Sequence, residues 1–195
     1  MPAGGAPVDW LLVGLGNPGS EYGRTRHNIG FRIAERLIER WSLPKPKARF
    51  RGLLTDGRTG PGGPRVGILL PQTFMNDSGQ SAGPAAGALH APPERVIALY
   101  DEIDLPFGEV RVRLGGGLAG HNGMKSLRRG LGTPGFWRVR AGVGRPPTTD
   151  PDRVAAYVLG RFTEPPEDVA LLVEQAADAA ERIVSGDETP TETPA

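Results

Sequence analysis

The chain of 195 residues contains no cysteine and only three histidines. Without cysteine there is no disulfide framework, no thiol nucleophile and no metal site with cysteine ligands. No apolar run approaches the length of a membrane-spanning helix. The first residues, MPAGGAPVD, have neither the basic nor the apolar region of a secretory signal. These absences favour a soluble, cytoplasmic protein with no membrane association.

Acidic residues are absent from one long segment, 110–149, although the net charge of the whole chain is only +1. The basic residues of this segment are Arg111, Arg113, Lys125, Arg128, Arg129, Arg138, Arg140 and Arg145. The chain from Asp150 onward is strongly acidic. Such asymmetry indicates a basic face for a polyanion. A solvated surface whose charges balance in three dimensions explains it equally well.

Hydrophobic patterning predicts the fold class. Short apolar or alternating runs predict strands at 9–13, 50–56, 65–70, 95–100, 109–114 and 137–143. Helical spacing of apolar or small residues predicts helices at 28–41, 77–89, 121–131, 151–159 and 165–184. Strands that alternate with helices predict an α/β fold: a single-domain sandwich with a mixed, mostly parallel central sheet flanked by helices, over residues 8–185. The ends, 1–7 and 186–195, are expected to be disordered.

The segment GLGNPG, residues 14–19, follows an apolar run and matches the G-x-G-x-x-G of dinucleotide-binding folds. In those folds a helix begins inside the motif, but here Pro18 interrupts it and a polar loop precedes the first helical apolar position, Ile29. The nearest acid at a strand end, Asp56, lies about twice as far along the chain as a ribose-binding acid would. The sequence therefore favours a loop whose glycines let backbone approach a substrate at a strand's carboxyl end.

Two histidines adjoin glycine loops, and each is followed by asparagine: His27-Asn28 and His121-Asn122. Asp101 ends the apolar run VIALY, which places it at the carboxyl edge of the predicted sheet. There it can accept a hydrogen bond from an imidazole and hold its tautomer. The alternative is that Asp101 only caps a turn. His90 is expected to be an exposed loop residue.

Other chemistries have less support in the sequence. No metal is expected, because neither H-E-x-x-H nor an EF-hand loop occurs. There is no G-x-S-x-G, and neither Ser78 nor Ser126 has a base nearby in sequence. A base-activated water remains, with Asn17, Asn76 and Asn122 as neutral groups that orient a substrate or donate to a developing oxyanion.

In several segments the chain closely resembles bacterial-type peptidyl-tRNA hydrolase. The stretches that carry the resemblance lie in the family's order over about residues 10–162. They are LLVGLGNPGSEYGRTRHNIGF, PQTFMNDSG, LYDEIDLPFGEVRVRLGGG, GHNGMKSL, FWRVRAGVGRP and YVLGRF.

The resemblance implies an esterase that hydrolyses the bond between peptide and tRNA in peptidyl-tRNA and so recycles tRNA. It implies His27 as the general base for water and Asp101 as the residue that orients it. The implied substrate-binding residues are Asn17, Tyr22, Met75, Asn76 and Asn122, and the implied contacts to the tRNA 5′ phosphate are Arg113 and Arg140. Peptidyl-tRNA is the implied partner, through its acceptor stem, 3′ end and 5′ phosphate. The resemblance also implies a monomer that needs no cofactor.

The chain departs from the family pattern at a few positions. Leu118 and Ala119 stand where a histidine and a glycine are usual, Phe107 where a second proline is common, and Leu70 where relatives are often basic. None of these positions has an implied catalytic role.

The sequence leaves two alternative functions to consider. A non-catalytic RNA-binding protein on the same fold would not need the base at His27 or its partner at Asp101. A nucleotide-dependent oxidoreductase is disfavoured by the context of GLGNPG.

Overall fold

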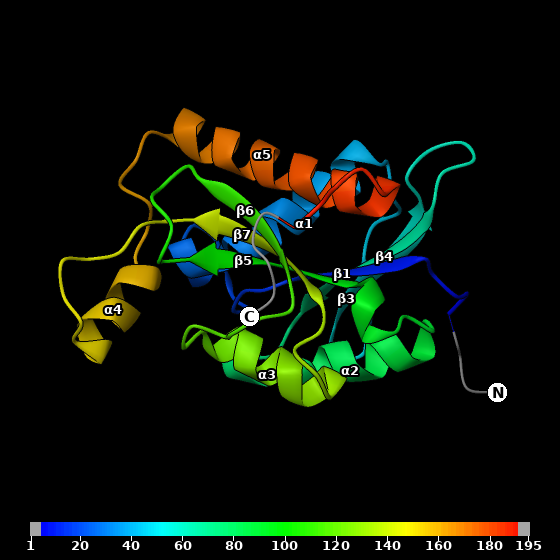
Figure 1. Ribbon diagram of the computed structural model, residues 1–195, viewed down its shortest axis with the longest axis horizontal. Coiled ribbons are helices and arrows are strands. Elements are labelled where there is room, and N and C mark those ends of the chain that lie inside the picture. Colours follow the sequence, from blue (N-terminus) through cyan, green and yellow to red (C-terminus); the bar gives the residue numbers. More distant parts are fainter. Residues whose placement is uncertain (1–4, 191–195) are drawn as a thin grey trace.

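The computed structural model describes residues 5–190 and contains one sheet of seven strands (Figure 1). The strands are β1 (Trp10–Gly14), β2 (Lys47–Arg49), β3 (Gly52–Arg58), β4 (Arg65–Pro71), β5 (Val96–Glu102), β6 (Val110–Leu114) and β7 (Trp137–Gly142). Their order across the sheet is β2-β3-β4-β1-β5-β7-β6. The central strands β4, β1, β5 and β7 run parallel, and the outer pairings are antiparallel. The predicted mixed, mostly parallel sheet is confirmed.

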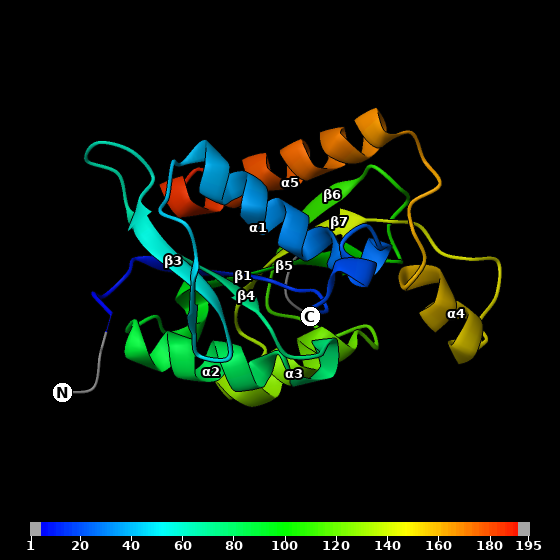
Figure 2. The same ribbon diagram turned by 180° about the vertical axis from the view of Figure 1, so that it is seen from behind.

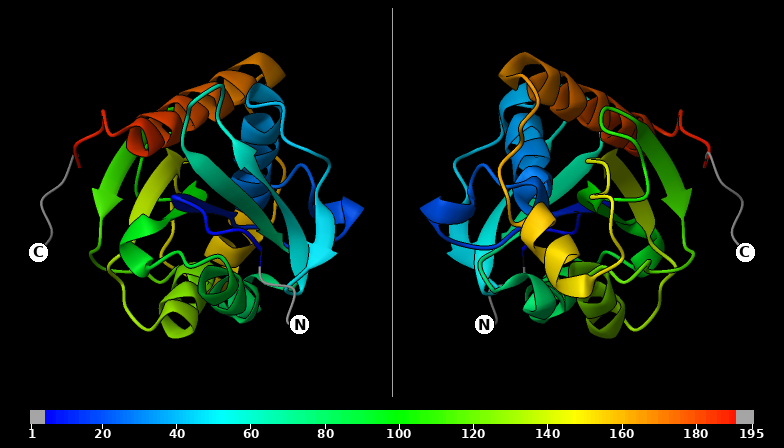
Figure 3. Two further views of the ribbon diagram at one scale, coloured as in Figure 1. Left: turned by 90° about the vertical axis from the view of Figure 1, so that its right-hand side faces the viewer. Right: turned by 90° about the vertical axis from the view of Figure 1, so that its left-hand side faces the viewer.

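Helices cover both faces of the sheet. Helices α1 (Ile29–Arg40) and α5 (Pro166–Ser185) lie on one face, and α2 (Gly79–Ala88) and α3 (Asn122–Leu131) lie on the other (Figures 1 and 2). Viewed along the sheet, the helices form a layer above and a layer below it (Figure 3). Helix α4 (Pro151–Val158) stands apart, beyond the ends at which β5 and β7 terminate. Within residues 5–190, no helix combines the length and apolar character needed to cross a membrane.

Strand β1 contributes to two separate cores. Trp10 and Leu12 belong to the cluster under α1 and α5, whereas Leu11 and Val13 belong to the cluster under α2 and α3. A strand buried on both faces has no polar side, which explains why WLLV reads as a continuous apolar run.

Three details of the strands differ from prediction. Phe50 and Arg51 were expected in a strand but form the turn between β2 and β3, with φ angles of 53° at both residues. Strand β2 was not predicted, because the three residues KAR carry no apolar alternation. In addition, Asp101 and Glu102 lie within β5, which extends further than the apolar run.

The ends of the chain are only partly described. Residues 1–4 and 191–195, which were expected to be disordered, lie outside the described residues. Residues 5–7 and 186–190 form neither helix nor strand. The domain bounds 8–185 stay a prediction.

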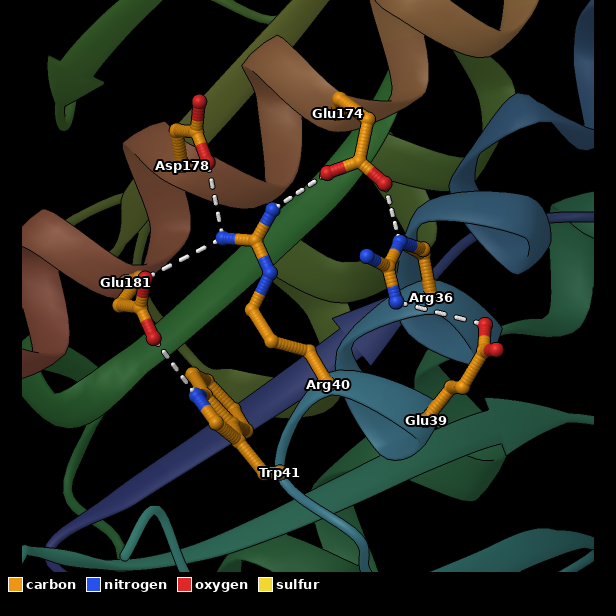
Figure 4. Close-up of polar contacts among 7 residues, drawn as sticks. All are labelled: Arg36, Glu39, Arg40, Trp41, Glu174, Asp178 and Glu181. Carbon is orange, nitrogen blue, oxygen red and sulfur yellow. Dashed lines mark hydrogen bonds and ion pairs between the residues drawn. The ribbon is translucent and has the colours of Figure 1, made fainter.

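An ion-pair network joins α1 to α5 (Figure 4). Its members are Arg36, Glu39, Arg40, Trp41, Glu174, Asp178 and Glu181. Arg40 lies 2.6 Å from Glu174, 2.8 Å from Asp178 and 3.1 Å from Glu181. Trp41 donates through Nε1 to Glu181 at 2.9 Å. The three carboxylates are 39–53% exposed, so solvent screens each pair, and the network rather than any one pair stabilises the seam.

Replacing Arg40→Met should lower the free energy of unfolding by about 1 kcal/mol, because it removes the centre of this network. Urea unfolding at low and high salt measures the effect, and the difference from wild type should shrink as salt rises. Arg58→Met, in the β3–β4 hairpin, is the matched control and should change stability little. A loss equal in both salts would mean that Arg40 contributes by packing rather than by charge.

Candidate active site

Polar side chains gather where β1, β4 and β5 end. Asn17 follows β1, Met75 and Asn76 open the short 3₁₀ helix η3 (Met75–Asp77) after β4, and Asp101 lies near the end of β5. The carboxyl ends of parallel strands are where open α/β sheets bind ligands. The sequence correctly predicted this edge for the glycine loop and for Asp101.

Two glycines bring α1 close to the sheet. A Cβ atom at Gly14 would lie 2.6 Å from the carbonyl oxygen of Gly30, and one at Gly30 would collide with the carbonyl oxygen of Leu99. Glycine is therefore required at both positions for this close approach. The first glycine of GLGNPG thus serves helix packing, which places His27, in the 3₁₀ helix η2 (Arg26–Asn28) just before α1, over the end of β5.

Asn28 fixes the glycine loop against η2. Its Oδ1 accepts from the backbone N–H of Asn17 at 2.8 Å, and its Nδ2 donates to the carbonyl oxygen of Asn17 at 2.9 Å. The side chain of Asn17 in turn accepts from the backbone N–H of Met75 at 2.8 Å. Because this bond occupies the oxygen of Asn17, its Nδ2 group is the one left to donate to a substrate.

Asp101 lies between two imidazoles. Nδ1 of His27 is 2.9 Å from Oδ2 of Asp101, and Nε2 of His121 is 2.9 Å from Oδ1. The side chain of Asp101 is 1% exposed, against 13% for His27 and 8% for His121. The carboxylate is thus desolvated, and each of its oxygens has a ring nitrogen as a partner.

This arrangement determines both tautomers. An ionised carboxylate only accepts, so both facing ring nitrogens must carry protons. For His121 a second bond agrees: its Nδ1 accepts from the backbone N–H of Met124 at 3.3 Å and caps α3. For His27 the proton on Nδ1 leaves Nε2 with a lone pair, which is the form a general base needs.

The charges of the cluster shift its pKa values in opposite directions. Burial alone would raise the pKa of Asp101, but His27 and His121 outweigh it and hold the pKa well below its usual range. Burial lowers the pKa of His27, but the charge and hydrogen bond of Asp101 outweigh that effect and raise the pKa above 6.5. Asp101 therefore stays ionised, and the pKa of His27 lies above its usual value.

The sequence predicted no metal site, but the same three side chains are of types that can bind a metal ion. Their donor atoms lie within 4.8 Å of one another, so His27, Asp101 and His121 have the residue types of a metal site. Both carboxylate oxygens, however, are at hydrogen-bond distance from a ring nitrogen. A metal would have to displace both of these bonds. The geometry therefore fits a carboxylate hydrogen-bonded to two imidazoles better than a metal coordination sphere.

A cleft of about 630 Å³ opens over the cluster. Its polar side is lined by Asn17, His27, Asn76, Asp101, His121 and Asn122. Its apolar lining comprises Phe74 and Ile103 together with Val154, Val158 and Leu159 from α4 and its C-terminal end. Phe74 and Leu159 are exposed large hydrophobic residues. A ligand with a polar reacting group and an apolar extension fits such a cleft.

Helix α4 forms the apolar wall although none of its own residues is buried. It is held from beneath by Tyr157, whose hydroxyl donates to the carbonyl oxygen of Val143 at 2.6 Å. The buried Arg26 stacks 3.9 Å from the Tyr157 ring and donates to the Tyr157 carbonyl oxygen at 2.9 Å. Since Arg26 precedes His27, one segment supports both sides of the cleft.

Most of the predicted site residues line this cleft, but three do not. His27, Asp101, Asn17, Met75, Asn76 and Asn122 line it. Tyr22, half-buried in the 3₁₀ helix η1 (Ser20–Tyr22), is not among its lining residues, and neither are Arg113 and Arg140.

The basic residues of β6 and β7 share one face of the sheet. Arg111 pairs with Arg140 and Arg113 with Arg138 across the two strands, and residues directly opposite point the same way. Arg138 is only 1% exposed, so its inclusion in a basic surface was wrong. The side chain of Arg140 is 12% exposed and donates to Glu102 at 3.0 Å.

Sequence reasoning did not assign roles to His121 and Asn28. The signal for His121 was present, because it adjoins a glycine loop and precedes an asparagine as His27 does. Its pairing with Asp101 was not predicted, because position along the chain does not show which imidazole a distant carboxylate will face. Asn28 looked like an ordinary helix start.

Comparisons with known proteins agree with this geometry. Residues 11–193 match the sequence model of the family described as peptidyl-tRNA hydrolase. The chain is 44% identical over 177 residues to the peptidyl-tRNA hydrolase of Renibacterium salmoninarum, covering 90% of this chain and 91% of that protein. It is 47% identical over 177 residues to that of Geobacillus kaustophilus, covering 89% and 92%.

A solved structure extends the match to the fold. The crystal structure of peptidyl-tRNA hydrolase from Acinetobacter baumannii superimposes with a TM-score of 0.82 at 36% identity, over 93% of this chain and 92% of that one. With the family sequence model matched over nearly the whole chain and relatives at this identity, the chain belongs to the peptidyl-tRNA hydrolase family.

Proposed function

We propose that this protein hydrolyses the ester bond between peptide and tRNA in peptidyl-tRNA, with His27 as the general base. The observation that carries the proposal is the 2.9 Å pairing of His27 Nδ1 with the buried Asp101, inside a cleft lined by asparagine side chains. This pairing leaves Nε2 of His27 unprotonated, so that its lone pair can accept a proton from water.

In the proposed reaction, Nε2 of His27 removes a proton from water as the water oxygen attacks the ester carbonyl. The carbonyl oxygen gains negative charge, and N–H donors of Asn17 and Asn122 stabilise it. When the tetrahedral intermediate collapses, the 3′ oxygen of the terminal ribose leaves and takes the proton from His27. The products are a free peptide and tRNA with an intact 3′ hydroxyl.

The shape of the cleft suggests how the substrate lies. The peptide would extend along the apolar wall of α4, and Met75 and Asn76 would border the reacting ester. Tyr22, outside the cleft lining, would contact the tRNA end rather than the reacting group.

Arg113 and Arg140 are proposed to hold the 5′ phosphate of the tRNA. They lie on one face of the antiparallel strand pair β6 and β7, and arginine can bind phosphate through two parallel N–H bonds. The bond from Arg140 to Glu102 orients its guanidinium. Phosphate contacts of this kind position a nucleic acid without reading its sequence, which suits an enzyme that acts on many tRNAs. A monomeric state stays a prediction from the family resemblance, and a cytoplasmic location stays a prediction from the composition of the sequence.

Replacing His27→Ala should lower kcat by about 10²–10⁴-fold and leave tRNA affinity nearly unchanged, because the base is lost while the phosphate contacts remain. Release of labelled peptide from peptidyl-tRNA and binding of tRNA measure the two effects. His90→Asn is the matched control, since His90 is exposed in a loop at φ 54° and asparagine tolerates that backbone. Full activity without His27 would favour a protein that only binds RNA.

The rate should depend on the neutral form of His27. Because the pKa of His27 is raised, kcat/KM should fall on the acid side through a pKa above 6.5. Asp101→Asn removes the negative charge that raises this pKa, so the acid limb should move to lower pH while the maximal rate drops. An acid limb that stays in place in Asp101→Asn would show that another group controls it.

Replacing both Arg113→Ala and Arg140→Ala should raise KM for full-length peptidyl-tRNA. Each lost phosphate contact should also reduce the slope of log KM against log salt by about one. Short peptidyl-nucleotides, which lack the 5′ phosphate, should be hydrolysed as by the wild type, and Arg58→Ala serves as the surface control. Equal losses on long and short substrates would contradict a phosphate contact.

A further inference from the structure

Arg138, on β7, is a charged residue buried in an unusual setting. It is 1% exposed and is among the largest fully buried side chains of residues 5–190. It lies 5.0 Å from the ring of Phe136. Burying a guanidinium is costly unless its donors are used, so its hydrogen-bond partners indicate its role.

Those partners are backbone carbonyls of two loops. Arg138 donates through Nη2 to Gly116 at 2.9 Å and to Pro134 at 3.1 Å, and through Nη1 to Gly117. Gly116 and Gly117 precede α3, whereas Pro134 follows it. The planar fork of arginine can reach several fixed acceptors at once, which the single ammonium of lysine does less well. Arg138 therefore ties together the two loops that flank α3.

The first of these loops carries His121. Residues Gly115, Gly116 and Gly120 have positive φ angles, and Ala119 has φ 48° without being glycine. Leu118 packs against the core under α2 and α3, and its carbonyl oxygen accepts from the backbone N–H of His121 at 3.0 Å. The loop therefore leads from the carbonyls held by Arg138 directly to the imidazole that donates to Asp101.

A second route joins Arg138 to the same imidazole. The ring of Tyr100 lies edge-on to that of His121, with centroids 5.1 Å apart and an interplanar angle of 75°. Tyr100 and Arg138 lie on the same face of the neighbouring strands β5 and β7, since Ala98 pairs with Arg138 and Tyr100 with Arg140. Burial lowers the pKa of Arg138, and the Tyr100 side chain opposes that effect. His121 is thus supported both from the loop and from the side.

We propose that Arg138 is a positioning residue, which holds the glycine loop and Tyr100 so that His121 donates to Asp101. It contacts neither substrate nor base and acts only through His121. The proposal rests on the proposed hydrolysis of peptidyl-tRNA by His27 and Asp101. It adds a buried residue that does not line the cleft but holds in place one that does.

A double-mutant cycle tests the proposal on short peptidyl-nucleotide substrates, which avoid the phosphate contacts. Arg138→Met should lower kcat at least tenfold with little change in KM. In a His121→Ala background the same substitution should cost less than twofold, because the residue through which it acts is already gone. If the losses instead multiply, Arg138 does not act through His121, and the proposal is overturned. Arg138→Lys, which keeps the charge but not the fork, should fall between wild type and Arg138→Met and replaces that variant if it does not fold.

A spectroscopic measurement separates this proposal from the proposed function. In protein labelled with ¹⁵N at histidine, the Nε2 proton of His121 should give a signal protected by its bond to Asp101. The signal should disappear in Arg138→Met, weaken in Arg138→Lys and persist in Arg40→Met, which weakens the distant α1–α5 seam. Its persistence in Arg138→Met overturns the positioning role. If the wild type releases no peptide while the signal behaves as expected, only the proposed function fails.

Discussion

The structure of the site depends on one buried negative charge. Asp101 sits at the end of a central strand, where its carboxylate is almost fully withdrawn from water. A charge in that position is tolerated only when hydrogen-bond donors replace the lost solvent. The two imidazoles supply those donors, so the need to satisfy Asp101 determines which nitrogen of His27 and of His121 carries a proton. The basic character of His27 Nε2 follows from this requirement rather than from His27 alone.

Bringing the two histidines to one carboxylate places demands on distant parts of the fold. Gly14 and Gly30 allow α1 to approach the sheet, and the ion pairs around Arg40 join the other end of that helix to α5. On the opposite side, Arg138 and Leu118 anchor the glycine loop that leads to His121. The cluster is therefore supported from both faces of the sheet, as expected for a constellation that must hold hydrogen-bond geometry closely.

The antiparallel pair β6 and β7 carries arginines in two different settings. Arg113 and Arg138 are direct neighbours across the strands, yet Arg138 is buried beneath the glycine loop. Sequence alone could not separate these cases, because the alternation that sets the face of the sheet is the same for both. Arg138 is enclosed because the loop after β6 brings the carbonyl oxygens of Gly116 and Gly117 to its guanidinium, which is a tertiary contact.

The sequence by itself determined six of the seven strands, the flanking helices and the edge at which the site lies, because hydrophobic periodicity and short loops leave few other arrangements. Together with the family resemblance, it also identified His27, Asp101 and the asparagines that line the cleft. The tertiary structure decided what depends on contacts between distant segments. It showed that His121 shares Asp101 with His27, that Tyr22 lies outside the cleft lining and that Arg138 belongs to the interior. The alternation of residues along a strand indicates which face of the sheet a side chain lies on, but only the folded chain determines what covers that face.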